Sequence, residues 1–171
     1  MSTDSPPSVA AWEAPPIVKE IARNSAVVAI NLVKFEGQVQ DLRAGDLIDT
    51  LGMQFKLGAA RPPEPNYFSA FVGIDLDCRA KNEPARSVAT ISCAYAAKYI
   101  VKDSELFCRL TDDDFVSFAS INGVLTLWPY LREFSNTAAQ RMMLPPVLLP
   151  FLQGVFNPAE ILKKAQRIDK L

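Results

Sequence analysis

Strict alternation of apolar and polar side chains constrains this fold more than any other feature of the sequence. Within 67–78 every second residue is apolar, from Phe68 to Cys78, which is the period of a strand with one buried face. Segments 53–57 and 87–101 alternate in the same way, and 104–110 is expected to be one more short strand. In 26–40 the apolar face moves from even to odd positions. This shift predicts a β-bulge, or else a strand buried on both faces at its start.

The period becomes helical after residue 110. Thr111 and the three aspartates that follow it are typical of a helix start, because a hydroxyl caps free N–H groups and acids complement the helix dipole. Gly123 and Pro129 predict a kink or break, and the proline pair that begins at Pro145 predicts the end of the helix. The apolar stripe of this helix comprises Phe115, Phe118, Ile121, Leu125 and Trp128.

The remaining segments complete an α+β chain of one domain. Prolines open predicted helices at 16–24 and 157–171, and the apolar segment 147–152 is expected to be an extended tether. Three prolines make 60–66 an irregular crossover loop, because proline donates no ladder hydrogen bond. Strands followed by helices indicate an antiparallel sheet with helices packed on it. Residues 1–15 are expected to be a flexible N-terminus, and 16–171 a single domain.

Composition argues against several functional classes. The 171 residues carry a formal net charge of −1, which argues against a nucleic-acid binder, and no apolar run reaches the ~20 residues of a stable membrane-spanning helix. Histidine is absent, as are Gly-rich phosphate loops, so the commonest catalytic and zinc sites are missing. We therefore expect no enzymatic activity, metal or cofactor. No signal peptide is apparent, and Cys78, Cys93 and Cys108 are expected to be buried thiols of a cytoplasmic protein.

Three segments carry a resemblance to a known family. The most specific is WPYLRE at 128–133 with QRMMLPPVLLP at 140–150, and the others are VGIDLD at 72–77 and DDFVSFASING at 113–123. In these segments, and over about 27–156, the sequence resembles the SecB export-chaperone family. The resemblance implies a four-stranded antiparallel sheet, a proline-rich crossover loop and a long helix on the sheet, and it suggests that part of 113–123 is strand. It also implies an ATP-independent chaperone (a holdase) for unfolded precursor polypeptides in protein export, assembled as a homotetramer, a dimer of dimers.

A chaperone requires exposed apolar surface, because unfolded segments are recognised by burial more than by sequence. The proline-rich loop is the best candidate for the wall of a client groove. Alternatively, Phe55 and Leu57 cover the core, and Tyr130 and Leu131 belong to an oligomer interface. The predicted client-binding groove comprises Phe55, Leu57, Pro62, Pro63, Tyr67, Tyr130, Leu131, Leu148 and Leu149. The predicted oligomer interface comprises Trp128, Leu131 and Phe134.

Charge distinguishes this chain from the family that it resembles. SecB proteins are usually strongly acidic and use acids to engage the translocase motor ATPase, whereas this chain is near neutral and ends in the basic segment LKKAQRIDK. Asp75 and Asp77, about 7 Å apart on one strand face, are candidate docking residues. The alternatives are a solvated strand face and, least favoured, a catalytic dyad. We expect weak or no motor binding.

Two further hypotheses for the function remain open. Some SecB-like proteins serve as chaperones for the antitoxin of a toxin–antitoxin pair, so a dedicated antitoxin chaperone is the second hypothesis. A small-ligand-binding α+β domain or enzyme is the third. A broad client range would separate the first hypothesis from the second, and a deep, discrete pocket would favour the third.

Overall fold

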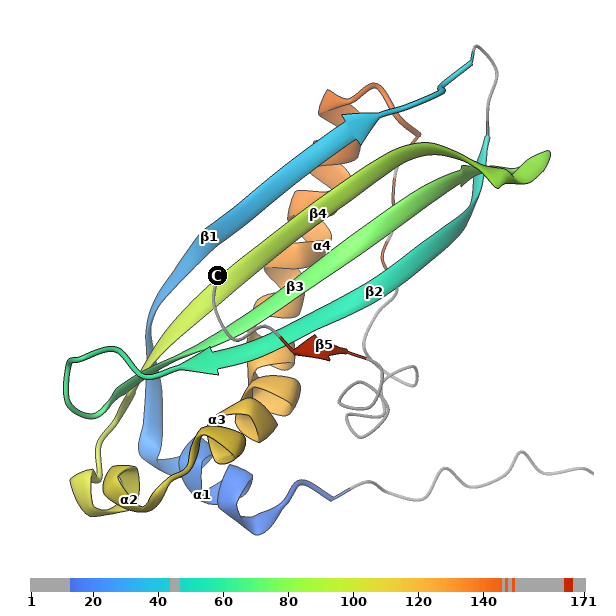
Figure 1. Cartoon of the computed structure of the whole chain (residues 1–171). Coiled ribbons are helices and arrows are strands. Elements are labelled where there is room, and N and C mark those ends of the chain that lie inside the picture. The colour runs from blue at the N-terminus through green and yellow to red at the C-terminus, as the bar shows by residue number, and fades with distance from the viewer. Residues whose placement is uncertain (1–12, 44–46, 146, 148, 150–164, 168–171) are drawn as a thin grey trace, which may run out of the picture.

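The fold is built on one antiparallel sheet. The computed structural model describes residues 13–43, 47–145, 147, 149 and 165–167. Four long strands form the sheet, β1 (Ser25–Val39), β2 (Ile48–Ala60), β3 (Tyr67–Ala80) and β4 (Glu83–Val101), and a two-residue strand, β5 (Gln166–Arg167), extends it. The strand order is β1-β4-β3-β2-β5 (Figure 1). The predicted α+β class is confirmed, with a fifth strand added to the four expected.

The crossover lies elsewhere than the sequence predicted. β2 and β3 are antiparallel neighbours, so the proline-rich segment 61–66 joins adjacent strands. β1 and β2 lie on opposite sides of the β3–β4 pair, so the chain crosses between them, after Val39 and before Ile48. The prediction for 60–66 was wrong because prolines exclude ladder donors but do not specify which strands a loop connects.

The alternation of β3 has the predicted consequence. All six apolar residues of its alternating face are at most 1% exposed. The residues between them are partly exposed, except for Gly73, which is buried against the neighbouring strand β4. The predicted bulge in β1 is also confirmed, since the β1–β4 register shifts twice, between Val27 and Ala29 and between Leu32 and Lys34. The alternative of a strand start buried on both faces is wrong, because Val27 and Val28 are exposed.

Capping residues determine where the short helices begin. α1 (Pro16–Asn24) opens on a proline, as predicted. α3 (Asp112–Phe118) begins with a capping box, in which Thr111 and Asp114 satisfy each other's backbone N–H groups. The strand predicted at 104–110 is wrong, because α2 (Ser104–Arg109) is a helix. Its N-cap residue, Asp103, accepts hydrogen bonds from the first backbone N–H groups.

A π-helical turn, η1 (Ala119–Gly123), joins α3 to the long helix α4 (Val124–Arg141). The expected irregularity near Gly123 is therefore present. A Cβ at Gly123 would lie 3.3 Å from that of Ala70, so glycine permits the close approach of the helix to β3. Pro129 lies inside α4 and does not end it. The strand that the family resemblance suggested within 113–123 is wrong, because these residues are helical throughout.

α4 ends in a Schellman motif. Met143 has a φ of 57° and donates its N–H to Gln140, and Leu144 donates its N–H to Ala139. The end predicted before the proline pair is therefore confirmed. Val147 and Leu149 of the predicted tether are buried. Leu148, residues 150–152 and most of the predicted C-terminal helix lie outside the described residues. Within that predicted helix, Gln166 and Arg167 form a strand, which contradicts the prediction there.

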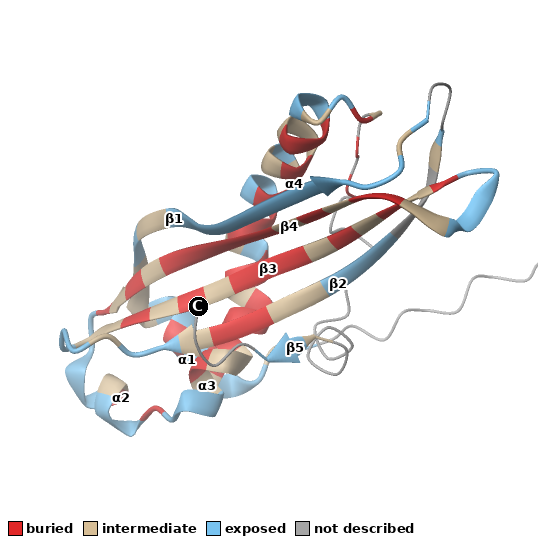
Figure 2. Ribbon diagram, turned by 45° about the horizontal axis from the view of Figure 1, so that its top comes forward, coloured by how far each residue is buried: buried red, intermediate tan, exposed pale blue. Residues whose placement is uncertain are grey.

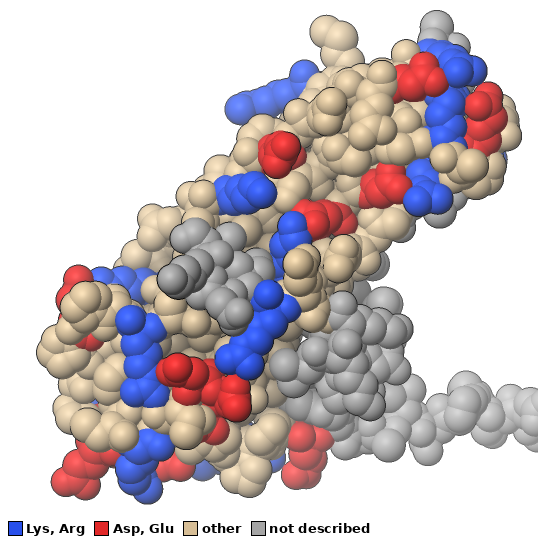
Figure 3. All heavy atoms as spheres, viewed as in Figure 1, with Lys and Arg blue, Asp and Glu red and all other residues tan. Residues whose placement is uncertain are grey.

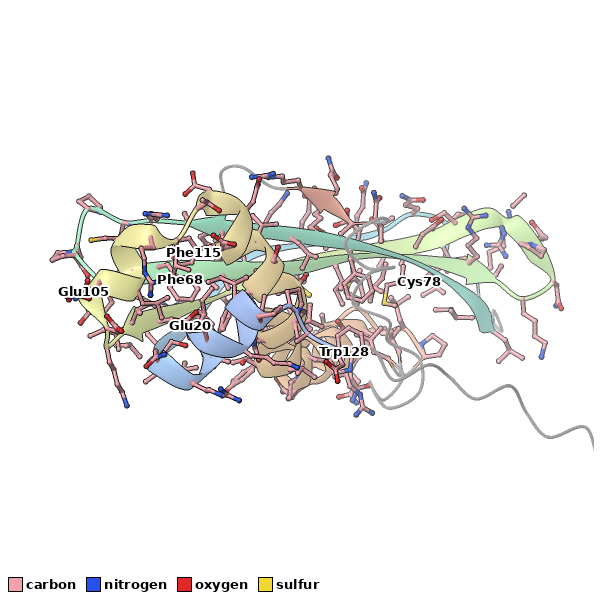
Figure 4. All side chains as sticks on the ribbon, turned by 90° about the horizontal axis from the view of Figure 1, so that it is seen from below. Glu20, Phe68, Cys78, Glu105, Phe115 and Trp128 are labelled. Atoms are coloured by element: carbon pink, nitrogen blue, oxygen red, sulfur yellow. The ribbon has the colours of Figure 1, made fainter. Side chains whose placement is uncertain are left out.

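The helices cover one face of the sheet, called here the inner face, and the other is the outer face (Figure 1). Phe68 from β3 and Phe115 from α3 meet between the layers, 4.5 Å between ring centroids (Figure 4). Phe118 and Tyr99 pack on the same ring. In the described part of the chain, no helix combines the length and apolar character needed to span a membrane.

Candidate functional site

The first two predicted groove residues lie on the inner face of β2 and differ in exposure. Leu57 is 2% exposed and belongs to the core. Phe55 is partly buried and stacks on Trp128 of α4, 5.8 Å between ring centroids at 26°. Leu57 is therefore enclosed in the core, as the alternative prediction for this residue stated. Phe55 remains partly exposed.

Tyr67 does not join Phe55 in a groove. It precedes Phe68 on β3, so its side chain is on the outer face, where the Lys98 ammonium lies 4.6 Å from its ring centroid. Pro62 is partly buried and Pro63 is exposed in the β2–β3 connection. Tyr67 therefore lies on the face opposite to Phe55, because adjacent residues of a strand point to opposite faces. The two prolines lie in the connection between the strands.

The predicted residues on α4 also divide by burial. Leu131 is fully buried and Trp128 is 3% exposed, so both belong to the core of the chain. Tyr130 is 44% exposed, with Tyr95 of β4 beside it at 5.8 Å. Phe134 is partly buried and contacts Phe35 of β1 edge to face, 5.0 Å between ring centroids. Leu149 is buried, and Leu148 lies outside the described residues.

Leu125 is an exposed residue of α4 that the sequence placed inward. It is 58% exposed, although it falls in the apolar stripe predicted for the helix. It precedes Trp128 by three positions, so the two lie on the same side of α4. Since Phe55 stacks on Trp128, this side faces β2, whereas Tyr130 faces β4. The name α4 surface is used below for Phe55, Leu125 and Tyr130.

β1 carries a further apolar surface that the sequence did not predict. Six large apolar residues along this edge strand are between 41% and 53% exposed, and β1 is exposed over most of its length (Figure 2). The alternation of 26–40 was recognised, but it was taken to mean burial, because a pattern cannot show how far the helix layer reaches. The β1 surface, as it is called below, comprises Val27, Val28, Leu32, Val33, Phe35 and Val39.

The outer face is polar and internally paired. Asp75 lies 2.5 Å from the Lys56 ammonium and accepts a hydrogen bond from Ser92. Asp77 accepts hydrogen bonds from Ser87 and Arg79. The Ser87 hydroxyl, with smaller help from Arg79, lowers the pKa of Asp77 below its usual value against the opposing effect of burial. Acids and bases alternate over this face rather than forming a patch of one sign (Figure 3).

The two aspartates are therefore held within the sheet. A shallow concavity of about 550 Å³ lies over them, lined by residues of β1, β2, β3 and β4. Each carboxylate already has a cationic and a hydroxyl partner, so docking to a basic surface would compete with these contacts.

Beside α4 a second cavity of about 300 Å³ is lined by Pro129, Arg132, Glu133, Asn136, Val147 and Leu149. The side-chain oxygen of Asn136 is buried there without a hydrogen-bond partner in the described part of the chain.

Two of the three cysteines are buried, as predicted, and one is exposed. Burial raises the pKa of Cys78 and of Cys93 to about 11. Cys108 is exposed, because the segment predicted as a strand is helix α2. Within the described ranges, no group of acidic or thiol side chains is arranged to hold a metal ion.

Comparison with known proteins defines the class of fold. The Mycobacterium tuberculosis Rv1957 SecB-like chaperone, solved in complex with a ChAD peptide from the Rv1956 HigA1 antitoxin, matches with a TM-score of 0.68. The match covers 82% of this chain and 99% of that chain at 20% identity. The chain therefore has the SecB-like chaperone fold, as the sequence resemblance predicted.

Other comparisons add no functional information. A protein of unknown function from Streptococcus agalactiae matches with a TM-score of 0.39, at 14% identity over 74% of this chain and 97% of its own, too low for inference. No protein-family model matches the sequence, and no curated protein matches it.

Proposed function

We propose that this protein is a chaperone that binds unfolded polypeptide segments without ATP. The observation that carries the proposal is the α4 surface, where Leu125 is 58% and Tyr130 44% exposed although the other side of the helix packs against the sheet. Apolar side chains that are exposed together on a folded domain mark a surface for another polypeptide, and these two side chains flank one helix, with Phe55 beside it. The SecB-like fold supports the same reading.

The α4 surface suits extended clients. Phe55 and Leu125 lie on the β2 side of α4 and Tyr130 lies on the other side, so an extended chain can contact apolar side chains on either side of the helix. Each contact depends on burial of apolar area, which requires no particular sequence.

The β1 surface supports assembly of several copies of the chain. An edge strand with six exposed apolar residues is a site for association, since unpaired edges and apolar patches both favour contact with another chain. We therefore assign the β1 surface to a second copy and retain the homotetramer, a dimer of dimers, as the proposed assembly.

A dedicated chaperone for one partner, such as an antitoxin, is the second candidate. The paired carboxylates of Asp75 and Asp77 favour it over a role in export, because their own partners compete with docking of these two residues to a translocase motor. The antitoxin peptide bound by Rv1957 supports the same alternative. Weak or absent binding to the motor ATPase remains part of the proposal.

The proposed function is tested with reduced, carboxymethylated α-lactalbumin, which is permanently unfolded. We expect fluorescence anisotropy to show a complex without ATP, and light scattering to show that the chain suppresses aggregation of a heat-denatured enzyme. Binding to one peptide of a diverse array, with no binding to α-lactalbumin, would favour the dedicated chaperone. Absence of binding to every peptide and unfolded protein would contradict both.

A further inference from the structure

β2 is a long edge strand with a short neighbour. It spans Ile48–Ala60, and its outward edge pairs with β5 only at Lys56 and Leu57. Among the described residues, nothing else pairs with this edge. From Thr50 to Ala60 its register with β3 is continuous. A long, regular edge whose described partners pair at Lys56 and Leu57 alone is a template for a further strand.

β5 shows which kind of segment this edge accepts. Gln166 pairs with Lys56 and Arg167 with Leu57, in parallel orientation. Arg167 also forms an ion pair with Asp113 of α3 at 3.2 Å and lines a cavity of about 390 Å³. The edge is thus occupied by a short strand of the chain itself, and the ion pair between Arg167 and Asp113 is exposed and contributes little to stability.

We propose that the β2 edge binds an extended client segment by parallel strand addition, and that β5 is the internal strand which the client displaces. This inference rests on the proposed chaperone function and adds its backbone contact. A client strand in this position would complete ladder hydrogen bonds along β2, which are independent of client sequence.

Side chains next to the edge define the client's chemistry. On the inner side they are Met53 and Phe55, and Phe55 is part of the α4 surface. On the outer side they include Gln54 and Lys56, whose ammonium is already paired with Asp75. Because strand side chains alternate between faces, the preferred segment alternates apolar and uncharged polar residues.

A reversible cross-link tests the assignment. Neighbouring strands lie about 4.8 Å apart, which is within the Cα separation of a disulfide, so Lys56→Cys with Gln166→Cys can bond β5 to β2. Cys108→Ser is included to remove the exposed native thiol. Oxidation should weaken binding of carboxymethylated α-lactalbumin at least tenfold, and reduction should restore it. Lys56→Cys with Cys108→Ser, treated in the same way, is the matched control, and its client affinity should be the same after oxidation and after reduction.

Amide hydrogen exchange supplies the second measurement. Client binding should slow exchange in 50–60 in the reduced protein and leave it unchanged in the oxidised one. Equal client affinity in both redox states, or failure of the disulfide to form, would overturn the edge assignment while leaving the chaperone function intact. Failure of the wild-type chain to bind α-lactalbumin would instead contradict the proposed function. In that case the rates of amide hydrogen exchange in 50–60, compared with and without the disulfide, would still report whether β5 protects the edge.

Discussion

Replacing Leu125 and Tyr130 together by serine should weaken client binding by about ten- to a hundredfold. Full burial of a large apolar side chain contributes about 1.5–3 kcal/mol. Scaled by exposures of 58% and 44%, the two side chains together offer about 1.5–3 kcal/mol to a client. At about 1.4 kcal/mol per tenfold, this corresponds to the stated change in Kd.

The fold should tolerate this change. Both side chains are exposed, so the free energy of unfolding should change by no more than about 1 kcal/mol for the pair. Urea denaturation measures that quantity, and fluorescence anisotropy with carboxymethylated α-lactalbumin measures Kd on the same preparation. The two measurements distinguish a lost contact from a damaged fold.

Leu47→Ser is the matched control. Leu47 is 61% exposed, a fraction similar to that of Leu125. It lies just before β2, where its carbonyl accepts the N–H of Lys81. This control should leave client affinity unchanged. Wild-type affinity in a folded Leu125→Ser, Tyr130→Ser variant would refute the α4 surface, and so would an equal loss in the control.

Three further outcomes follow from burial and hydrogen bonding. Leu57→Ala should reduce the free energy of unfolding by about 2–5 kcal/mol in urea denaturation; a loss below about 1 kcal/mol would contradict its place in the core. A thiol reagent at pH 8 should modify Cys108 alone in the folded protein and all three thiols after denaturation, since burial raises the pKa of Cys93 to about 11; a second reactive thiol would be inconsistent with this. Ser87→Ala should raise the pKa of Asp77 in an NMR titration, because the Ser87 hydrogen bond is the main cause of the lowered value. A carboxylate whose pKa is lowered by folding stabilises the fold at pH values above its unfolded-state pKa, and this stabilisation is lost as the pH falls through the folded-state pKa. The acid-unfolding midpoint of the variant should therefore move to higher pH. An unchanged titration of Asp77 would refute the assignment.

Local signals in the sequence predicted most of the elements. The alternation of β3 and the cap at Thr111 act within a few residues, so they can be recognised without knowledge of the rest of the chain. α2 was missed because six residues show no clear period, and the cap that decides between strand and helix is Asp103, just outside the segment. The crossover and β5 depend on strands far apart in sequence, which no local pattern specifies.

The site was predicted less completely than the fold. The alternation of 53–57 placed Phe55 and Leu57 on one face, but their exposure depends on how α4 covers that face. Leu57 is enclosed, whereas Phe55 lies at the margin beside Trp128. The β1 surface was missed for the same reason. Its alternation resembles that of a buried strand, but α4 crosses the sheet at an angle and meets β1 toward the end of the strand, where Phe134 contacts Phe35 (Figure 1).

The two edges of the sheet differ in regularity, and this difference predicts separate functions. Two bulges interrupt the β1–β4 ladder, at Val28 and Val33, and both side chains are exposed. β1 therefore offers apolar side chains more than a continuous backbone ladder, because bulges twist an edge and disrupt pairing. β2, which is regular from Thr50 to Ala60, offers the ladder.

Val28→Glu with Val33→Glu should therefore reduce the size of the assembly while client affinity per chain stays within about threefold, less than 1 kcal/mol. Placing two carboxylates in an apolar interface costs several kcal/mol if they are desolvated without partners. Multi-angle light scattering measures the mass, and anisotropy with carboxymethylated α-lactalbumin measures Kd. The matched control is Val28→Thr with Val33→Thr, which keeps the β-branched shape without adding charge and should retain the larger assembly. A glutamate variant that keeps the wild-type mass would refute assembly through β1, and one that becomes monomeric and loses client binding would show that the two edges do not act independently.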